Sequence, residues 1–228
     1  MNSKKIIVAL DSNNLEITKK LVNKLKSEAY AFKIGYEFFL NYGIKGYKEI
    51  KKISPKIFLD LKLHDIPNTV KKGIEAIDKL KPLFTTIHIS GGDEMMKSSI
   101  IKRRYTKILG VSILTSLNSK QTSKYYNERQ IELLVRKFVM HAEKIGLDGI
   151  VCSPKEIKLI RKLVNKNFLI VTPGIRTNGI GSKNDDQKRV LTPEKAIELG
   201  ANYLVIGRPI TKSSNPLKKI KEINYSIK

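Results

Sequence analysis

Short runs of β-branched and aromatic residues alternate along the whole chain with longer stretches of helical periodicity. The runs are typical of buried strands and lie at residues 5–11, 31–35, 56–65, 83–90, 107–114, 149–153, 168–175 and 202–210. After each run, apolar residues recur three or four positions apart, which predicts an amphipathic helix. The predicted helices cover 14–28, 36–53, 68–80, 93–103, 129–145, a stretch from Pro154, 192–200 and a stretch from Asn215. The two longest predicted loops are polar and cover 115–128 and 176–192.

Eight strands, each followed by a helix, predict a (β/α)8 TIM barrel in the α/β class. The chain has 228 residues, close to the typical length of that fold, and no linker or shift in composition divides it. We therefore expect residues 1–228 to form a single domain. A doubly wound open sheet is the alternative, but no Gly-x-Gly-x-x-Gly follows the first predicted strand.

The third predicted strand places charged side chains where a buried strand is normally apolar. In the segment "FLDLKLHDIPNT", the leucines share one face, while Asp60 and Lys62 lie side by side on the other. Catalytic groups of such barrels collect at the C-terminal ends of the strands. With Asp65 and with Lys33 on the preceding strand, these residues predict a row of alternating charges. Alternation would keep the lysines protonated and the carboxylates ionised, in a catalytic site or in an ion-pair network that plugs the barrel mouth.

The net charge of +23, from 44 Lys and Arg against 21 Asp and Glu, raises the possibility of nucleic-acid binding. The basic residues are spread in pairs along the helical patterns, however, and no nucleic-acid module motif is present. We therefore expect a lysine-rich solvated surface, which would attract anionic substrates, and no nucleic-acid binding.

Hydropathy and cysteine content exclude further classes of protein. No apolar run approaches the roughly 20 residues that span a bilayer, and the first apolar run stops at Asp11. We expect a cytoplasmic protein that does not interact with membranes. The single cysteine, Cys152, excludes an internal disulfide and a cysteine-based metal site, and its apolar surroundings predict a buried structural thiol.

Several motifs together resemble the orotidine 5'-phosphate decarboxylase family. They are "VALD", "FLDLKLHDIPNT", "TPGIR", "DDQKRVLTP" and "VIGRPI", which follow one another in the family's order from residue 6 to about 216. The resemblance implies a homodimeric barrel that converts orotidine 5'-monophosphate to UMP and carbon dioxide, the last step of UMP synthesis. It also implies that the reaction needs neither a metal nor an organic cofactor.

The resemblance assigns roles to the charged residues. Lys62 would donate the proton to pyrimidine C6, Asp60 would lie next to the departing carboxylate, and Lys33 would orient Asp60 and contact the ribose. Asp65 would reach into the active site of the partner subunit. Ile66 and Thr69 would belong to the same crossing segment.

The remaining substrate contacts follow from the same resemblance. Asp11 would bind the ribose, and Thr115 would contact the base. Four positions match those that grip the phosphate in the family, namely Arg176, Gln187, Gly207 and Arg208.

Two other functions remain as alternatives. The first is a metal-dependent decarboxylase or an aldol-type synthase of sugar phosphates, because related barrels share Asp-x-Lys-x-x-Asp. The "IPNT" continuation and "TPGIR" argue against it, whereas a strict magnesium requirement would favour it. The second is a nucleic-acid-binding protein, which rests on net charge alone.

Overall fold

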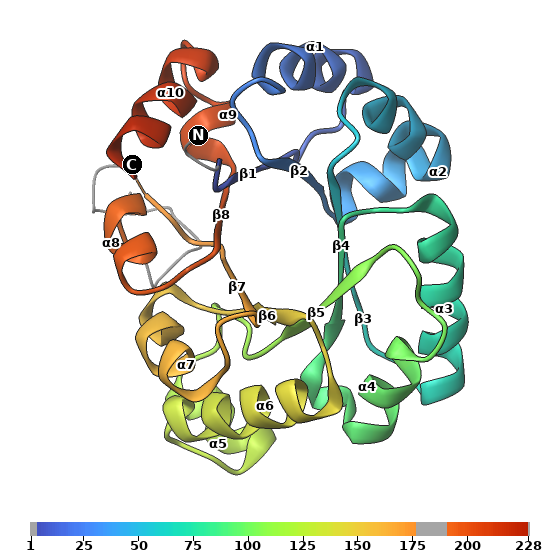
Figure 1. Cartoon of the computed structure of the whole chain (residues 1–228), viewed down its shortest axis with the longest axis vertical. Coiled ribbons are helices and arrows are strands. Elements are labelled where there is room, and N and C mark those ends of the chain that lie inside the picture. Colours follow the sequence, from blue (N-terminus) through green and yellow to red (C-terminus); the bar gives the residue numbers. More distant parts are fainter. Residues whose placement is uncertain (1–3, 177–190, 228) are drawn as a thin grey trace.

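Eight parallel strands close into a barrel in the computed structural model, which describes residues 4–176 and 191–227. Each strand pairs with the next, and the eighth pairs with the first, so the predicted TIM barrel is confirmed (Figure 1). The strands are β1 (Ile6–Ala9), β2 (Ala31–Ile34), β3 (Ile57–Leu63), β4 (Phe84–His88), β5 (Lys107–Val111), β6 (Gly149–Val151), β7 (Leu169–Thr172) and β8 (Tyr203–Ile206).

The helices form a ring around the barrel and follow one another in chain order (Figure 1). They are α1 (Leu15–Leu25), α2 (Tyr36–Ile53), α3 (Pro67–Leu80), α4 (Asp93–Ile100), α5 (Ser119–Tyr126), α6 (Ile131–Ile145), α7 (Ile157–Leu163), α8 (Pro193–Glu198), α9 (Arg208–Thr211) and α10 (Pro216–Ser226). Short 3₁₀ turns, η1 (Ile89–Gly91) and η2 (Pro154–Glu156), precede α4 and α7. Polar side chains before α1, α5, α8 and α10 accept hydrogen bonds from the first-turn amides, which fixes where these helices begin.

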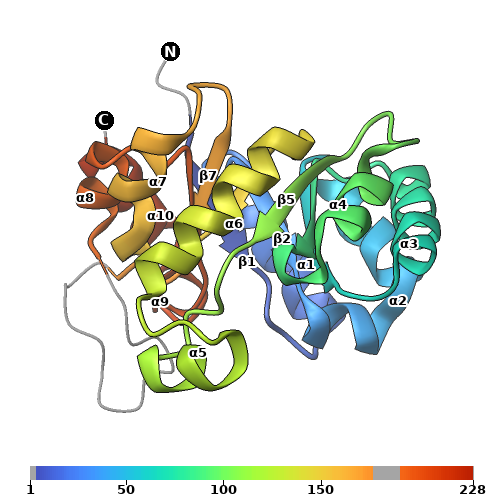
Figure 2. The same cartoon turned by 90° about the horizontal axis from the view of Figure 1, so that it is seen from below.

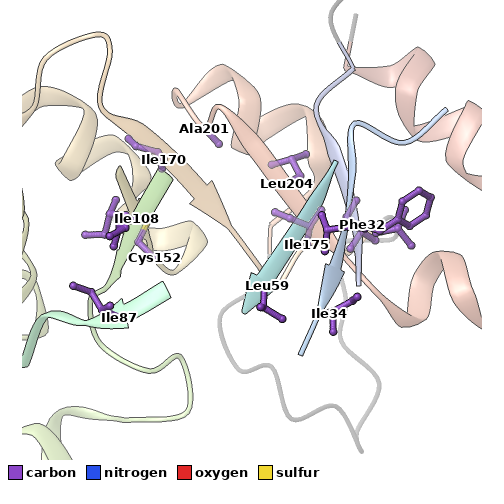
Figure 3. Close-up of a cluster of buried hydrophobic side chains, with 14 of the residues drawn as sticks. Phe32, Ile34, Leu59, Ile87, Ile108, Cys152, Ile170, Ile175, Ala201 and Leu204 are labelled. Atoms are coloured by element: carbon purple, nitrogen blue, oxygen red, sulfur yellow. The ribbon is translucent and has the colours of Figure 1, made fainter. Parts of the chain in front are cut away.

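The main core lies between the barrel and the helices. Outward-facing strand residues such as Phe32, Leu59 and Ile170 are buried there against apolar faces of the helices (Figure 3). Every second residue of a barrel strand faces the helices, so the apolar residues that alternate along the predicted strands form this layer. Cys152 is part of this layer and is 1% exposed, as the apolar stretch around it predicted.

A second, smaller core fills the barrel interior toward the N-terminal ends of the strands. Phe58 and Phe84 meet edge to face at 5.8 Å between ring centroids, and Tyr30 stacks on Tyr203 at 4.2 Å. Because these rings plug the N-terminal end, polar side chains one layer further along the strands line a space that opens at the C-terminal end.

Several predicted boundaries are wrong, and two of the differences have a clear physical cause. The segment 115–128 was expected to be a loop, yet it contains α5, because Asn118 and Gln121 form a reciprocal capping box that starts a short helix. The eighth strand was expected to reach residue 210, but it ends at Ile206 and α9 begins at Arg208. Pro209 explains this difference, since its fixed φ suits the first turn of a helix and it cannot donate to a strand ladder.

Within residues 4–176 and 191–227, none of the helices is both long enough and apolar enough to cross a membrane.

Candidate active site

A cavity of about 610 Å³ opens at the C-terminal ends of the barrel strands. It brings together eight of the residues that the sequence singled out, from the ends of six different strands and the loops that follow them. These residues are Asp11, Lys33, Asp60, Lys62, Thr115, Arg176, Gly207 and Arg208. Strand ends and loops far apart in the sequence therefore build one site.

Asp60 lies at the centre of the charged part of this cavity. Its Oδ2 atom is 2.8 Å from Lys62 Nζ and 3.6 Å from Lys33 Nζ, and Thr86 donates a hydrogen bond of 2.9 Å to Oδ1. Lys33 Nζ is also 3.5 Å from Asp11 Oδ1. The structure thus arranges Asp11, Lys33, Asp60 and Lys62 as a continuous row of alternating charges.

The surroundings of Asp60 favour its ionised form. Burial of the side chain, which is 9% exposed, raises the pKa of the carboxyl group. The positive charges of Lys33 and Lys62, with the hydrogen bonds from Lys62 and Thr86, lower it by more, so the pKa lies below its usual value. Asp60 is therefore a buried carboxylate at neutral pH, held by two ammonium groups.

Lys62 has an unusual backbone conformation. Its φ of 43° is in the left-handed region, which non-glycine residues adopt at a cost of roughly 1–2 kcal/mol. An irregularity in the pairing of β3 with β4 spans Leu59 to Leu63 and includes Lys62. Tyr36, at the start of α2, donates a hydrogen bond of 2.8 Å to the carbonyl of Leu61 and so anchors the irregular segment. Strain at a charged residue beside a cavity is typical of functional sites.

Gly35 allows Lys33 to approach the backbone closely. A Cβ atom at this position would lie 3.0 Å from Lys33 Nζ. A larger residue at 35 would therefore displace the ammonium group that bridges Asp11 and Asp60.

Asp65, Ile66 and Thr69 do not line the cavity of their own chain. All three are exposed, Ile66 to 67%, and they lie between the end of β3 and the first turn of α3. Asp65 Oδ1 accepts a hydrogen bond of 2.7 Å from the amide of Ile66, and within the described parts of the chain it has no ion-pair partner. One chain therefore brings together Asp60, Lys62 and Lys33, but not Asp65.

Two guanidinium groups also line the cavity. Arg176 follows β7, and its amide donates 3.0 Å to the carbonyl of Leu191 beside the short bridge between Ile175 and Leu191. Arg208 opens α9 directly after β8. Gln187 lies outside the described residues.

Sequence reasoning missed several residues of the site. Lys212 and Glu37 line the cavity, and Thr86 and Tyr36 contact the charged row or the backbone beside it. Strand alternation places Thr86 on the inward face of β4 with Phe84 and His88, but it does not reveal the contact of Thr86 with Asp60. Glu37 lies in the first turn of α2 and Lys212 directly follows α9, so strand periodicity did not point to them.

His88, at the end of β4, lies near the charged row without lining the cavity. Its ring stacks on His64 at 5.3 Å between centroids. Burial lowers the pKa of His88, and the neighbouring His64 and Lys62 lower it further. His88 is therefore neutral at physiological pH.

No group of three or more histidine, cysteine or acidic side chains is placed to hold a metal ion in residues 4–176 and 191–227.

A closed (β/α)8 barrel with a buried charged row at its C-terminal mouth is the architecture of a barrel enzyme. The sequence profile of the "Orotidine 5'-phosphate decarboxylase / HUMPS family" matches residues 4–223. The chain belongs to this family, as its motifs predicted.

Individual relatives agree with this assignment. The chain is 44% identical over 224 residues to an orotidine 5'-phosphate decarboxylase of Wolbachia sp. subsp. Brugia malayi, covering 97% of this chain and 98% of the relative. It is 41% identical over 230 residues to the enzyme of that name from Coxiella burnetii, covering 98% of this chain and 97% of the relative. A crystal structure of orotidine 5'-phosphate decarboxylase from Lactobacillus acidophilus has a TM-score of 0.83 and 35% identity, covering 98% of this chain and 99% of that one.

Proposed function

We propose that the protein is a carboxy-lyase that converts orotidine 5'-monophosphate to UMP and carbon dioxide, without a metal or an organic cofactor. The family assignment and the names of the relatives support the decarboxylase activity. The observation that carries the mechanism is the buried Asp60 carboxylate, held between Lys33 and Lys62 at the cavity floor.

Lys62 is the proposed proton donor. The bond between C6 of the pyrimidine and the carboxylate breaks, its electron pair stays on C6, and carbon dioxide leaves. The developing carbanion has no adjacent carbonyl to take up its charge, so a fixed ammonium group is the stabiliser that the site offers. A proton then passes from Lys62 Nζ to C6, and the neutral amine regains a proton from solvent.

Asp60 and Lys33 prepare Lys62 for this step. The Asp60 carboxylate, 2.8 Å from Lys62 Nζ, fixes where the ammonium group lies. In the proposed complex Asp60 also lies next to the substrate carboxylate. Lys33, 3.6 Å from Asp60, orients it from the other side and contacts the ribose.

The other cavity residues would bind the non-reacting parts of the substrate. Asp11 would hold the ribose, Thr115 the base, and Arg176, Gly207 and Arg208 the phosphate, together with Gln187. Guanidinium groups give phosphate two parallel hydrogen bonds, and barrels commonly bind phosphate after strands seven and eight. Binding energy from the distant phosphate would contribute to transition-state stabilisation at C6.

A homodimer is part of the proposal. Asp65, Ile66 and Thr69 are exposed and would enter the partner's active site, where Asp65 would complete the charged row. Two exposed apolar side chains of α2, Tyr36 at 52% and Leu40 at 80%, lie one helical turn apart and offer apolar area for subunit contact. A cytoplasmic location remains the prediction from the sequence.

The test is a decarboxylation assay with purified protein and orotidine 5'-monophosphate, followed by the loss of ultraviolet absorbance, with and without EDTA. We expect turnover that EDTA does not change. Turnover of sugar phosphates that requires magnesium, with none of orotidine 5'-monophosphate, would favour the metal-dependent alternative and overturn the proposal.

A further inference from the structure

Thr86 occupies the point at which the pairing of β3 with β4 changes register. Leu59 pairs with Thr85 and Leu63 pairs with Ile87, so residues 60–62 of β3 lie opposite Thr86 alone. The side chain of Thr86 is fully buried, and it faces the barrel interior one layer above Phe84. One residue of β4 cannot form regular backbone hydrogen bonds with three residues of β3. The backbone of residues 60–62 therefore needs a further hydrogen-bond partner.

The Thr86 hydroxyl is that partner, and it both accepts and donates a hydrogen bond. Its Oγ1 accepts a hydrogen bond of 2.8 Å from the amide of Lys62 and donates one of 2.9 Å to Asp60 Oδ1. The directions are unambiguous, because an amide can only donate and a carboxylate can only accept. One hydroxyl therefore joins the carboxylate of Asp60 to the backbone of Lys62.

This bridge holds both ends of the Asp60–Lys62 ion pair. The accepted bond fixes the backbone of Lys62 in its left-handed conformation, with φ of 43°. The donated bond fixes one oxygen of Asp60, which leaves Oδ2 to face Lys62 Nζ at 2.8 Å and Lys33 Nζ at 3.6 Å.

We propose that Thr86 is a positioning residue, whose hydroxyl sets the place of the Lys62 ammonium group relative to Asp60 and hence to the reacting carbon. The inference rests on the proposed decarboxylase function and adds a residue to it. Thr86 does not line the cavity, so it acts through Asp60 and Lys62 and not through contact with substrate. Small errors in the placement of a catalytic group lower the rate strongly.

The test compares Thr86→Val, which keeps the shape but removes the hydroxyl, with Thr86→Ser, which keeps the hydroxyl. We expect Thr86→Val to lower kcat by about 10- to 100-fold, the size of a lost hydrogen bond to a charged group. KM should change by less than about threefold, because ribose and phosphate contacts lie elsewhere. Thr86→Ser should restore kcat to within about fivefold of wild type. Thr86→Ala serves as a second hydroxyl-free variant if Thr86→Val folds poorly, with the same expected loss.

Thr85→Val is the matched control. Thr85 is the neighbouring residue on β4, is equally buried, and donates a hydrogen bond of 2.9 Å to the carbonyl of Leu59 without touching the charged row. Its loss should lower stability but leave kcat unchanged, which separates a structural effect from a positioning effect.

The pH dependence of kcat/KM gives a further readout. The hydrogen bond from Thr86 helps to lower the pKa of Asp60, so the acidic limb of the profile should move to higher pH in Thr86→Val and stay in place in Thr85→Val.

Four outcomes overturn the inference. They are wild-type kcat in the hydroxyl-free variants, equal losses in Thr86→Val and Thr86→Ser, a change confined to KM, and a matching loss of kcat in Thr85→Val. The failure of this inference can be distinguished from the failure of the proposed function. In the four outcomes above the wild type is active, whereas an inactive wild-type protein would overturn the proposed function itself.

Discussion

Asp60 is a single carboxylate that faces two ammonium groups and one hydroxyl in a nearly dry setting. Its pKa lies below the usual value of 3.8, even though burial acts in the opposite direction. The charges of Lys33 and Lys62, together with the hydrogen bonds from Lys62 and Thr86, therefore outweigh the effect of burial on this pKa. At the scale of one residue, the carboxylate is a structural anchor of the site as well as a group that faces substrate.

Replacement of Asp60 by asparagine should inactivate the enzyme and lower the free energy of unfolding by about 3 kcal/mol at neutral pH, because two lysines lose their common partner. A lowered folded-state pKa gives stability that is present above the unfolded-state value of about 3.8 and is lost as pH falls through the folded value. The difference in the free energy of unfolding between wild type and Asp60→Asn should thus be constant at neutral pH and become smaller below about pH 4. Urea unfolding at a series of pH values measures this difference. A difference that stays constant down to pH 3 would show that ionised Asp60 does not stabilise the fold.

The left-handed conformation of Lys62 makes a second, independent prediction. Lys62→Gly should be more stable than Lys62→Ala by about 1 kcal/mol, because glycine adopts positive φ without strain. Both variants lose the same ammonium group, so the difference between their thermal stabilities reports the contribution of the backbone conformation at position 62. The same pair at Lys33, which has ordinary φ in β2, is the control and should give the opposite order. Equal stabilities at position 62 would show that no strain is stored there.

At the scale of elements, the connection from α4 to β5 depends on one side chain of α3. Asp78 is buried and accepts hydrogen bonds of 2.9 to 3.0 Å from the amides of Arg104, Tyr105 and Thr106. Burial raises the pKa of Asp78, but these three backbone hydrogen bonds lower it below the usual value. The carboxylate thus fixes the path by which the chain enters the fifth strand.

Asp78→Asn should lower the free energy of unfolding by about 2–3 kcal/mol, because an amide group cannot accept all of these bonds. Activity of the folded protein should be unchanged, since Asp78 does not line the cavity. Glu75→Gln, one turn earlier on α3, is the control and should change stability by less than about 0.5 kcal/mol. Denaturant unfolding and an assay of the native protein measure both quantities.

Elements with strong periodicity were predictable, and those that depend on local capping or pairing defects were not. The pattern of 36–53 matched the bounds of α2 but not the kink inside it, where Gly43 has a non-helical backbone with φ of 54°. The helix α5 is short and polar and owes its start to the capping box of Asn118. In the site, the placement of Asp60 and Lys62 on one face followed from alternation. The bridging role of Thr86 did not, because it arises from an irregularity that only the β3–β4 register reveals.

At the scale of the whole molecule, the central expectation is that each active site needs two chains. Lys62 lines the cavity of its own chain, while Asp65 is exposed outside it. Lys62→Ala and Asp65→Ala should each form inactive homodimers. In a mixture whose subunits exchange, one site of each mixed dimer regains both residues, so activity should rise to about a quarter of the wild-type value.

The same mixture with sedimentation analysis tests the dimer directly. A monomeric protein, or a mixture that stays inactive although mixed dimers form, would contradict the shared site. Two preparations of Lys62→Ala mixed with each other provide the control and should stay inactive.

The rate of orotidine 5'-monophosphate decarboxylation by wild type and Lys62→Ala, measured side by side on folded protein, tests the role of the charged row most directly. We expect turnover by the wild type and a loss of at least about a thousandfold in the variant, since one ammonium group both stabilises the carbanion and supplies the proton. A variant that stays within about tenfold of the wild type would show that the charged row around Asp60 does not perform the chemistry.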